Sequence, residues 1–415
     1  MREMKDSGIE WIGDIPVSWK IMPNKYLMRK EKKICPVYHG EDILSLTMKG
    51  VIVRDLDAGG KMPTSFDGYQ RLEAGNLLMC LFDIDVTPRC VGLIKQAGVS
   101  SPAYSQFVLR KGADAAYYCY YYTMLDNDKT LLHLAKNLRH SLTEDQLGAI
   151  PVIVPPIEEQ QRIADFLDTK CAEIDALTAD IQTQIDTLEQ YKRSVITETV
   201  TKGLNPDAEM KDSGIQWIGN MPVHWDVIRG KYILRYMQKP VREDDGVITC
   251  FRDGEVTLRS NRREDGFTMS DKEIGYQGID IGDLVVHGMD GFAGSIGISN
   301  SRGKASPVLN VLDTDQCKRY IMYYLRSMAY SDVFLALATG IRVRSCDLRW
   351  NKLAELSYPV PPLDEQNAIV KHIDSVLSKA DAVIADKKAQ LATLDEYKKS
   401  LIFEYVTGKK EVPTS

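Results

Sequence analysis

The chain has 415 residues, of which 44% are hydrophobic and 27% are charged, a composition typical of a globular protein with more than one domain. It has no apolar run long enough to span a membrane and no apolar signal-peptide core, so we expect a cytoplasmic protein without a membrane partner. The eight cysteines form no CxxC pair and no short metal spacing, and we expect reduced, mostly buried thiols and neither metal nor cofactor.

The first element is a motif with two tryptophans at 4–19, MKDSGIEWIGDIPVSW, which returns at 210–225 as MKDSGIQWIGNMPVHW. Twelve of the sixteen positions of this tryptophan motif match, at an offset of 206 residues. The duplication predicts two tandem halves, each with a tryptophan motif, a globular body and a long helix, and not a solenoid. We expect the two tryptophans of each copy to pack onto their own domain and not to contact a ligand.

The first body, roughly 20–154, mixes short strand-like runs with helices. Residues 75–82 and 90–94 read as strands between turns, and Ser-Pro-Ala-Tyr at 101–104 reads as a turn. A helix rich in tyrosine occupies 117–125. Aromatic residues at helical spacing usually belong to a core, so we expect packing here and not base contacts.

A long helix follows from Pro155-Pro156 to about Thr201, and its second copy runs from Pro361 to about Thr407. Proline is tolerated in the first turn, and the acidic residues after it suit the helix dipole. Both copies carry apolar residues at 4-3 spacing, the pattern of a coiled coil about 65 Å long. We expect the copies to pack on each other, antiparallel if a two-fold relates the halves; two unrelated surface helices are the alternative. The expected helix or subunit interface comprises Leu167, Ile174, Ile181, Leu188, Leu377, Ile384, Leu391 and Leu394.

The second body, roughly 226–360, repeats the landmarks of the first and little else. The two strands and the tyrosine helix recur at 282–286, 296–298 and 320–328, but the sequence between them hardly matches. Two domains that share the same supporting frame but recognise different targets would show this contrast. Neutral drift after duplication is the alternative, although drift would erode the helices more evenly.

The net charge of −6 argues against a nucleic-acid partner until its distribution is considered. Residues 158–200 hold ten acidic and four basic residues, and residues 364–406 hold eight and six. The remaining chain has 40 acidic and 42 basic residues. The acidic surplus therefore lies on the helices, and the bodies could still face a polyanion.

Basic residues gather in the variable parts of both bodies. Arginine suits phosphate groups and guanine edges, so we favour a DNA-binding face, although solvated surface charge is the alternative for each residue alone. Arg342 and Arg344 lie two apart, and an extended segment would aim both to one side. The candidates are Arg54, Lys61, Arg89, Lys95, Arg139, Arg252, Arg259, Arg262, Arg263, Arg302, Lys304, Arg342 and Arg344.

Catalytic motifs are missing from the sequence. It has no phosphate-binding loop, no dinucleotide fingerprint after a strand, no nucleophile elbow and no zinc-spaced His/Cys set. Residues 206–211 have the residue types of a metal-dependent nuclease. Their two acidic residues lie only two apart in the linker before the second tryptophan motif, and we interpret them as a coincidence. We therefore expect no catalytic residue and no metal ligand.

The doubled tryptophan motif, the PPxxEQ start of each helix, and the phrases EQYKRS at 189–194 and DEYKKS at 395–400 resemble the specificity subunit of type I restriction–modification systems. The resemblance implies an α+β fold: two mixed α/β target recognition domains in a pseudo-two-fold tandem repeat, with two long helices that form an antiparallel coiled coil. It implies target recognition domains at 1–154 and 205–360, and conserved helices at 155–204 and 361–415.

The resemblance also implies partners and a role. Each target recognition domain reads one half of a bipartite site in double-stranded DNA, and the helices space the domains and dock two methyltransferase (modification) subunits, which restriction/translocase subunits join. The first body departs from the family at 83–88, where it lacks the Asp-Gly turn found at 290–294 of the second. Two other functions stay open: an enzyme that cuts or methylates DNA itself, and a coiled-coil scaffold without a DNA role.

Overall fold

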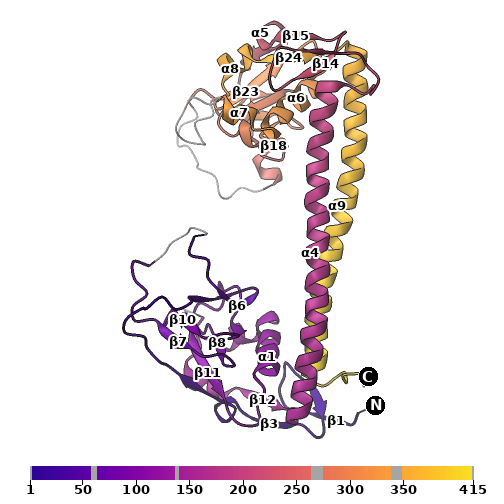
Figure 1. Cartoon of the computed structure of the whole chain (residues 1–415). Coiled ribbons are helices and arrows are strands. Elements are labelled where there is room, and N and C mark those ends of the chain that lie inside the picture. The colour runs from indigo at the N-terminus through magenta and orange to yellow at the C-terminus, as the bar shows by residue number, and fades with distance from the viewer. Residues whose placement is uncertain (1, 58–62, 136–139, 263–273, 338–347, 414–415) are drawn as a thin grey trace. The chain divides into compact units, whose positions relative to one another are not determined.

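The structure, a computed structural model, describes residues 2–57, 63–135, 140–262, 274–337 and 348–413 (Figure 1). The chain divides into two units, Met1–Ile181 with Ala389–Ser415, and Gln182–Lys388. Each unit therefore holds one tryptophan motif, one body and part of both long helices.

The first unit combines short antiparallel strands with helices. Its elements are β1 (Met4–Asp6), β2 (Asp14–Pro16), β3 (Lys20–Pro23), η1 (Asn24–Tyr26), β4 (Met28–Glu31), β5 (Leu44–Thr47), β6 (Gly50–Val53), β7 (Gln70–Leu72), β8 (Leu77–Met79), β9 (Val91–Leu93), β10 (Gly98–Ser100), β11 (Ser105–Leu109), α1 (Ala115–Asn127), α2 (Thr130–Leu134), α3 (Glu144–Ala149) and β12 (Pro151–Val154). A four-stranded sheet has the order β4-β11-β8-β9, and the other strands form the two-stranded sheets β1-β2, β3-β12, β5-β6 and β7-β10.

The second unit repeats this plan. Its elements are β13 (Met210–Asp212), β14 (Asn220–Pro222), β15 (Asp226–Arg229), α5 (Gly230–Ile233), β16 (Arg235–Met237), β17 (Ile248–Cys250), β18 (Val256–Leu258), η2 (Arg259–Asn261), β19 (Gln277–Ile279), β20 (Leu284–His287), η3 (Gly291–Ala293), β21 (Ile296–Ile298), β22 (Gly303–Ala305), β23 (Leu309–Asp313), α6 (Lys318–Tyr330), α7 (Val333–Ala336), α8 (Trp350–Glu355) and β24 (Ser357–Val360). Its four-stranded sheet, β16-β23-β20-β21, has the same strand order as the first.

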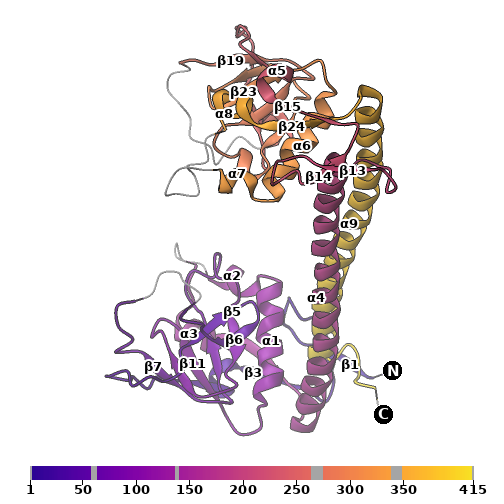
Figure 2. The ribbon, with the colours of Figure 1, turned by 45° about the horizontal axis from the view of Figure 1, so that its top comes forward.

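The two long helices are α4 (Ile157–Lys202) and α9 (Leu363–Val406), as the heptad pattern predicted. They run antiparallel, because in the first unit Asp175 of α4 pairs with Lys398 of α9, and in the second Lys192 pairs with Asp381. Both views show the two ribbons side by side within each unit (Figures 1 and 2). The chain ends also meet in the first unit, where Arg2 pairs with Glu411.

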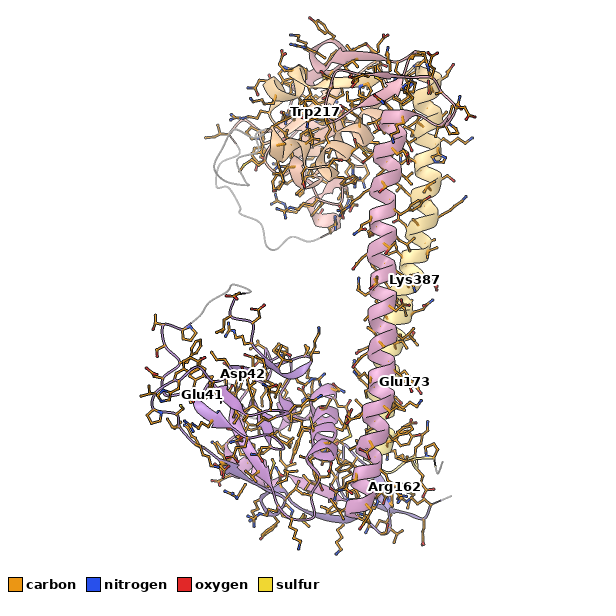
Figure 3. All side chains as sticks on the ribbon, in the orientation of Figure 1. Glu41, Asp42, Arg162, Glu173, Trp217 and Lys387 are labelled. Carbon is orange, nitrogen blue, oxygen red and sulfur yellow. The ribbon has the colours of Figure 1, made fainter. Side chains whose placement is uncertain are left out.

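Each unit has a core that joins the tryptophan motif, the body and both helices. In the first unit Trp19 packs with the tyrosines of α1, the start of α4 and the end of α9. In the second, Trp225 packs with the tyrosines of α6, the end of α4 and the start of α9. Trp19 and Trp225 are fully buried, and Trp217, labelled in Figure 3, packs partly buried against the second core. The prediction that the tryptophans of the motif are structural is confirmed.

The landmarks of the bodies are also confirmed, with one correction. The turn at 101–104 is present, and α1 buries four tyrosines, Tyr117, Tyr118, Tyr121 and Tyr122. The strand predicted over 75–82 is shorter and ends at Met79. It ends early because the chain turns at Asp83, which adopts a left-handed conformation (φ 46°) and whose carbonyl accepts the amide protons of Val86 and Thr87.

Candidate nucleic-acid interface

The glutamine of each PPxxEQ motif locks a body to its long helix. Gln160 is fully buried; its Oε1 accepts the amide proton of Asp114, the residue that caps α1, at 2.8 Å. Its Nε2 donates to the carbonyls of Gly112 and Pro155. Gln366 makes the matching bond to the amide of Cys317, which precedes α6, at 2.9 Å. One side chain thus satisfies the buried backbone groups where three segments meet.

The glutamate of the PPxxEQ motif holds the tryptophan motif, and here the halves differ. In the first unit Glu159 accepts a hydrogen bond from Trp19 Nε1 at 2.8 Å and pairs with Arg2. In the second unit Glu365 lies 2.8 Å from His224 Nε2. Trp225 Nε1 has no hydrogen-bond partner within the described part of the chain. The duplicated sequence therefore has a structural reason: it builds the joint that carries each body.

The predicted seam residues lie along the coiled coil. Leu167, Ile174 and Ile181 are buried in the first unit, and Ile384 is buried in the second. The other four, Leu188, Leu377, Leu391 and Leu394, are half-buried. Polar contacts flank this seam: Lys387, labelled on α9 in Figure 3, bonds to Gln184 of α4, and Glu173 on α4 pairs with Lys170 of its own helix.

Four of the predicted DNA-binding residues, Arg89, Arg252, Arg262 and Arg302, pair with carboxylates of their own body, and the side chains of Arg89 and Arg302 are the least exposed of the four. Arg302 lies 2.8 Å from Asp245 and 2.5 Å from Asp280, and its side chain is 21% exposed. The side chains of Lys239 and Arg302 hold the pKa of Asp280 at about 2. Arg89, 17% exposed, lies 3.3 Å from the buried Asp126. With these ion pairs and their low exposure, Arg89 and Arg302 have fewer donors available to DNA than an exposed arginine has.

The other candidates are distributed over the surface of the bodies. Lys95 is exposed after β9, Arg54 is half-buried after β6, and Lys304 is half-buried on β22. Arg252, Arg259 and Arg262 lie together around one cavity of the second unit. Lys61, Arg139, Arg263, Arg342 and Arg344 lie outside the described residues.

A β-hairpin docks on the four-stranded sheet of each body, and a glycine makes room for it. A Cβ atom at Gly92 would lie 2.8 Å from Leu46 and Val51 of the β5-β6 hairpin. A Cβ atom at Gly297 would lie 1.9 Å from the carbonyl oxygen of Gly254 in the β17-β18 hairpin. These two glycines are the central residues of the matched strands β9 and β21, so both hairpins occupy the same place.

The loop before β5 is fixed to the body of the first unit. Glu41 and Asp42, labelled in Figure 3, lie in this loop. Backbone amides, that of His39 first, lower the pKa of the Glu41 carboxyl. Asp42 Oδ2 accepts a hydrogen bond from Gln96 at 2.7 Å. The hairpin therefore starts from an anchored segment.

The cavity of the second unit has a volume of about 550 Å³ and lies against the β17-β18 hairpin. His287 lines it, and burial lowers the pKa of its imidazole. His287 Nδ1 accepts the amide protons of Met289 and Asp290, so the proton of the neutral ring lies on Nε2. Ser295, 1% exposed, also lines the cavity, and its hydroxyl has no partner among the described residues.

Sequence reasoning missed the hairpins, the two docking glycines, and the roles of His287 and Ser295. A signal for the docking existed: a glycine at the centre of the same strand in both halves indicates close backbone approach. The carboxylate partners of Arg89 and Arg302 gave no such signal, because Asp126 and Asp245 lie 37 and 57 residues away.

No group of three or more His, Cys, Asp or Glu residues suited to a metal ion occurs in the described ranges. In the same ranges, no helix is both long and apolar enough to cross a bilayer. Five of the seven cysteines described are buried and two are half-buried. Burial raises the pKa of the Cys90 and Cys250 thiols, and it raises the pKa of the Cys119 thiol to about 11. The raised pKa makes these three thiols poor nucleophiles.

Comparisons with known proteins point in one direction. A family model for the type I restriction modification DNA specificity domain matches residues 91–187, from β9 into α4. A protein described as the type I restriction enzyme MjaX specificity subunit of Methanocaldococcus jannaschii is 25% identical over 288 residues, 66% of this chain and 62% of that protein. The resemblance to type I specificity subunits is confirmed.

Further similarities extend this result. The MjaVIII specificity subunit of the same organism is 24% identical over 280 residues, 63% of this chain and 63% of that protein. The chain thus spans less than two thirds of the length of the curated relatives it matches. A solved chain from work on complex assembly and conformational transition of the type I R-M system has a TM-score of 0.67 at 14% identity, over 95% of this chain and 99% of that one. The predicted α+β fold, with its antiparallel coiled coil, is confirmed.

Proposed function

We propose that this chain is the non-catalytic, DNA-binding specificity subunit of a type I restriction–modification complex in the cytoplasm. Its two bodies, within 1–154 and 205–360, act as target recognition domains for the halves of a bipartite, asymmetric site in double-stranded DNA. The helices dock two methyltransferase subunits, and restriction subunits join them. The partner subunits carry out the chemistry, and this chain needs no cofactor.

The observation that carries the proposal is a repeated frame that holds different hairpins. Both four-stranded sheets have the same strand order, and in both halves the glutamine of the PPxxEQ motif, Gln160 or Gln366, joins the body to the long helix. The hairpins on these frames differ: Met48 and Lys49 form the tip of the first, whereas Phe251, Arg252 and Asp253 form that of the second. Two bodies that are attached to the helices in the same way but carry different hairpin tips suit a DNA site whose two halves have different sequences.

DNA physics assigns separate roles to the candidate basic residues. Contacts to phosphate supply salt-dependent affinity, and contacts to base edges in the major groove supply sequence preference. Lys95 and Lys304 suit the first role. Arg252 and Arg259, which lie at one cavity together with Arg262, suit the second.

Methylome sequencing of the host with and without this gene tests the proposal. We expect a motif with two different short half-sites and an unread gap to vanish on deletion and to return on complementation. An unchanged methylome, with no footprint of the chain and its methyltransferase on DNA, would favour the scaffold. Methyl transfer by the purified chain alone would favour a complete enzyme.

A further inference from the structure

The tips of the two docked hairpins carry different side chains, although each has one exposed basic residue, Lys49 in the first and Arg252 in the second. In the first unit Met48 is 61% exposed at the tip, and Ile52 and Val53 on β6 are 41% and 45% exposed. In the second unit the tip carries Arg252, whose side chain is 63% exposed. Both hairpins border a cavity, but of these two only the second has a described arginine at its tip.

Arg252 is aimed by a carboxylate at the edge of the cavity. Its Nη2 donates to Asp290 Oδ1 at 3.1 Å. A guanidinium has five N–H groups, so this bond leaves several donors for a ligand. Arg262 packs over the ring of Phe251, 4.1 Å from its centroid, and pairs with Asp253 at 2.8 Å, which fixes the two residues on either side of Arg252.

The backbone of the tip is held from behind as well. Arg326 of α6 donates to the carbonyl of Asp253 at 2.8 Å. Gly294 and Gly297 allow the hairpin backbone to approach, because a Cβ at either position would lie within 2.7 Å of a hairpin carbonyl oxygen. A reader held this rigidly loses little conformational entropy on binding and places its donors with a fixed geometry.

The charges around the cavity favour a base edge over a phosphate group. Asp253 and Asp290 line it together with three arginines, so the two carboxylates cancel most of the positive charge that would attract a phosphate. A base pair presents donors as well as acceptors. The neutral imidazole of His287 at the cavity adds a donor that carries no charge.

Building on the proposed function, we propose that the β17-β18 hairpin and its cavity are the base-reading site of the second body, and that Arg252 reads a guanine there in the major groove. Guanine presents two acceptors, O6 and N7, which match the fork of an arginine. Asp290 and Arg262 act as positioning residues, the first on the guanidinium and the second on the tip.

Competition binding tests this assignment in the complex of the full chain with its methyltransferase subunits. The probes are a duplex with the host motif and the set of its single-base substitutions. The variants are Arg252→Ala and Arg252→Lys, and Arg229→Ala is the matched control, because Arg229 is an exposed, paired arginine of the same unit that does not line the cavity. Lysine keeps the charge and loses the fork, which separates base reading from phosphate binding.

We expect both Arg252 variants to lose about tenfold or more of their discrimination at one G·C position of one half-site, while the other half-site stays unchanged. Equal weakening on every sequence by Arg252→Ala, with normal binding by Arg252→Lys, would mean a phosphate contact and overturn the assignment. Unchanged preference in both variants would also overturn it. If Arg252→Ala loses binding because it unfolds, its melting temperature will be lowered. In that case the base discrimination of Arg252→Lys alone tests the assignment. A wild-type complex without any bipartite preference would refute the proposed function itself.

Discussion

The hydroxyl of Tyr117 donates a hydrogen bond to the carbonyl of Val406, the last residue of α9, at 2.8 Å. The last carbonyls of a helix have no partner within it, so this bond satisfies a buried group. In the second unit the hydroxyl of Tyr320 lies 3.1 Å from the carbonyl of Val200, near the end of α4. In both units a tyrosine of the body thus holds the helix end that the other half of the sequence supplies.

Tyr117→Phe removes this bond without changing the packing of the ring. We expect the free energy of unfolding to fall by about 1–2 kcal/mol, because a buried carbonyl loses its donor. Chemical denaturation followed by circular dichroism measures the change. Tyr26→Phe, at a side chain that is 58% exposed, is the control and should have almost no effect. Equal stability of the Tyr117 variant and the wild type would show that the bond contributes nothing.

Charge reversal at Lys398 and Asp175 tests the register of the coiled coil. Their charged atoms are 2.6 Å apart, and Asp175 is 63% exposed, so the pair stabilises by only about 0.5 kcal/mol. We expect Lys398→Glu to lower the free energy of unfolding by roughly 1 kcal/mol, through the lost attraction and the new repulsion. The double variant with Asp175→Lys should recover most of this loss. Additive losses in the double variant would contradict the antiparallel pairing.

Gly297→Ala should displace the β17-β18 hairpin, because its Cβ would lie 1.9 Å from the carbonyl of Gly254. We expect a loss of about 1–3 kcal/mol in the free energy of unfolding, as for overpacked cores. The preference for one half-site should weaken as well. Gly148→Ala, on helix α3 with its nearest contact at 3.4 Å, is the control and should be neutral or stabilising. A variant that keeps both stability and preference would refute the docking argument.

His287 makes the stability of the second unit depend on pH. Burial lowers the pKa of its imidazole in the folded state, while the unfolded chain binds a proton near pH 6.5. The unfolded state therefore binds more protons as the pH falls below about 6.5, and the free energy of unfolding decreases until the folded pKa is reached. His287→Asn keeps an acceptor for the backbone amides and should remove this slope. Denaturation of both proteins from pH 5 to 8 measures it, with the exposed His372→Asn as control.

Extension of the coiled coil should change the gap in the recognised site and leave its half-sites as they are. Whole heptads added at matched places in α4 and α9 preserve the apolar seam. If the helices space two independent readers, methylome sequencing of the variant should show the same half-sites with a different separation. Altered half-sites would mean that the readers do not act independently.

The sequence predicted the duplicated frame well, because the tryptophan motif, the PPxxEQ motif and the heptads are local patterns that occur twice. The bodies were harder to predict, since their strands have three to five residues and pair across long stretches of chain. Hairpin β5-β6 could not be placed on β9 from Gly92 alone. Arg302 illustrates the same problem for the site: an arginine in a variable region looks like a DNA ligand until its partners Asp245 and Asp280 are known.

Gln160 sets a rule for anyone who exchanges modules in this protein. Its amide ties the carbonyl of Gly112, the amide of Asp114 and the carbonyl of Pro155 into one buried knot. If a foreign module is fused between the tyrosine helix and Pro155-Pro156, its backbone must form the hydrogen bonds that Gly112 and Asp114 make with Gln160. A replacement module should therefore include its own glutamine, with the fusion point placed after that residue, at an exposed position of the long helix.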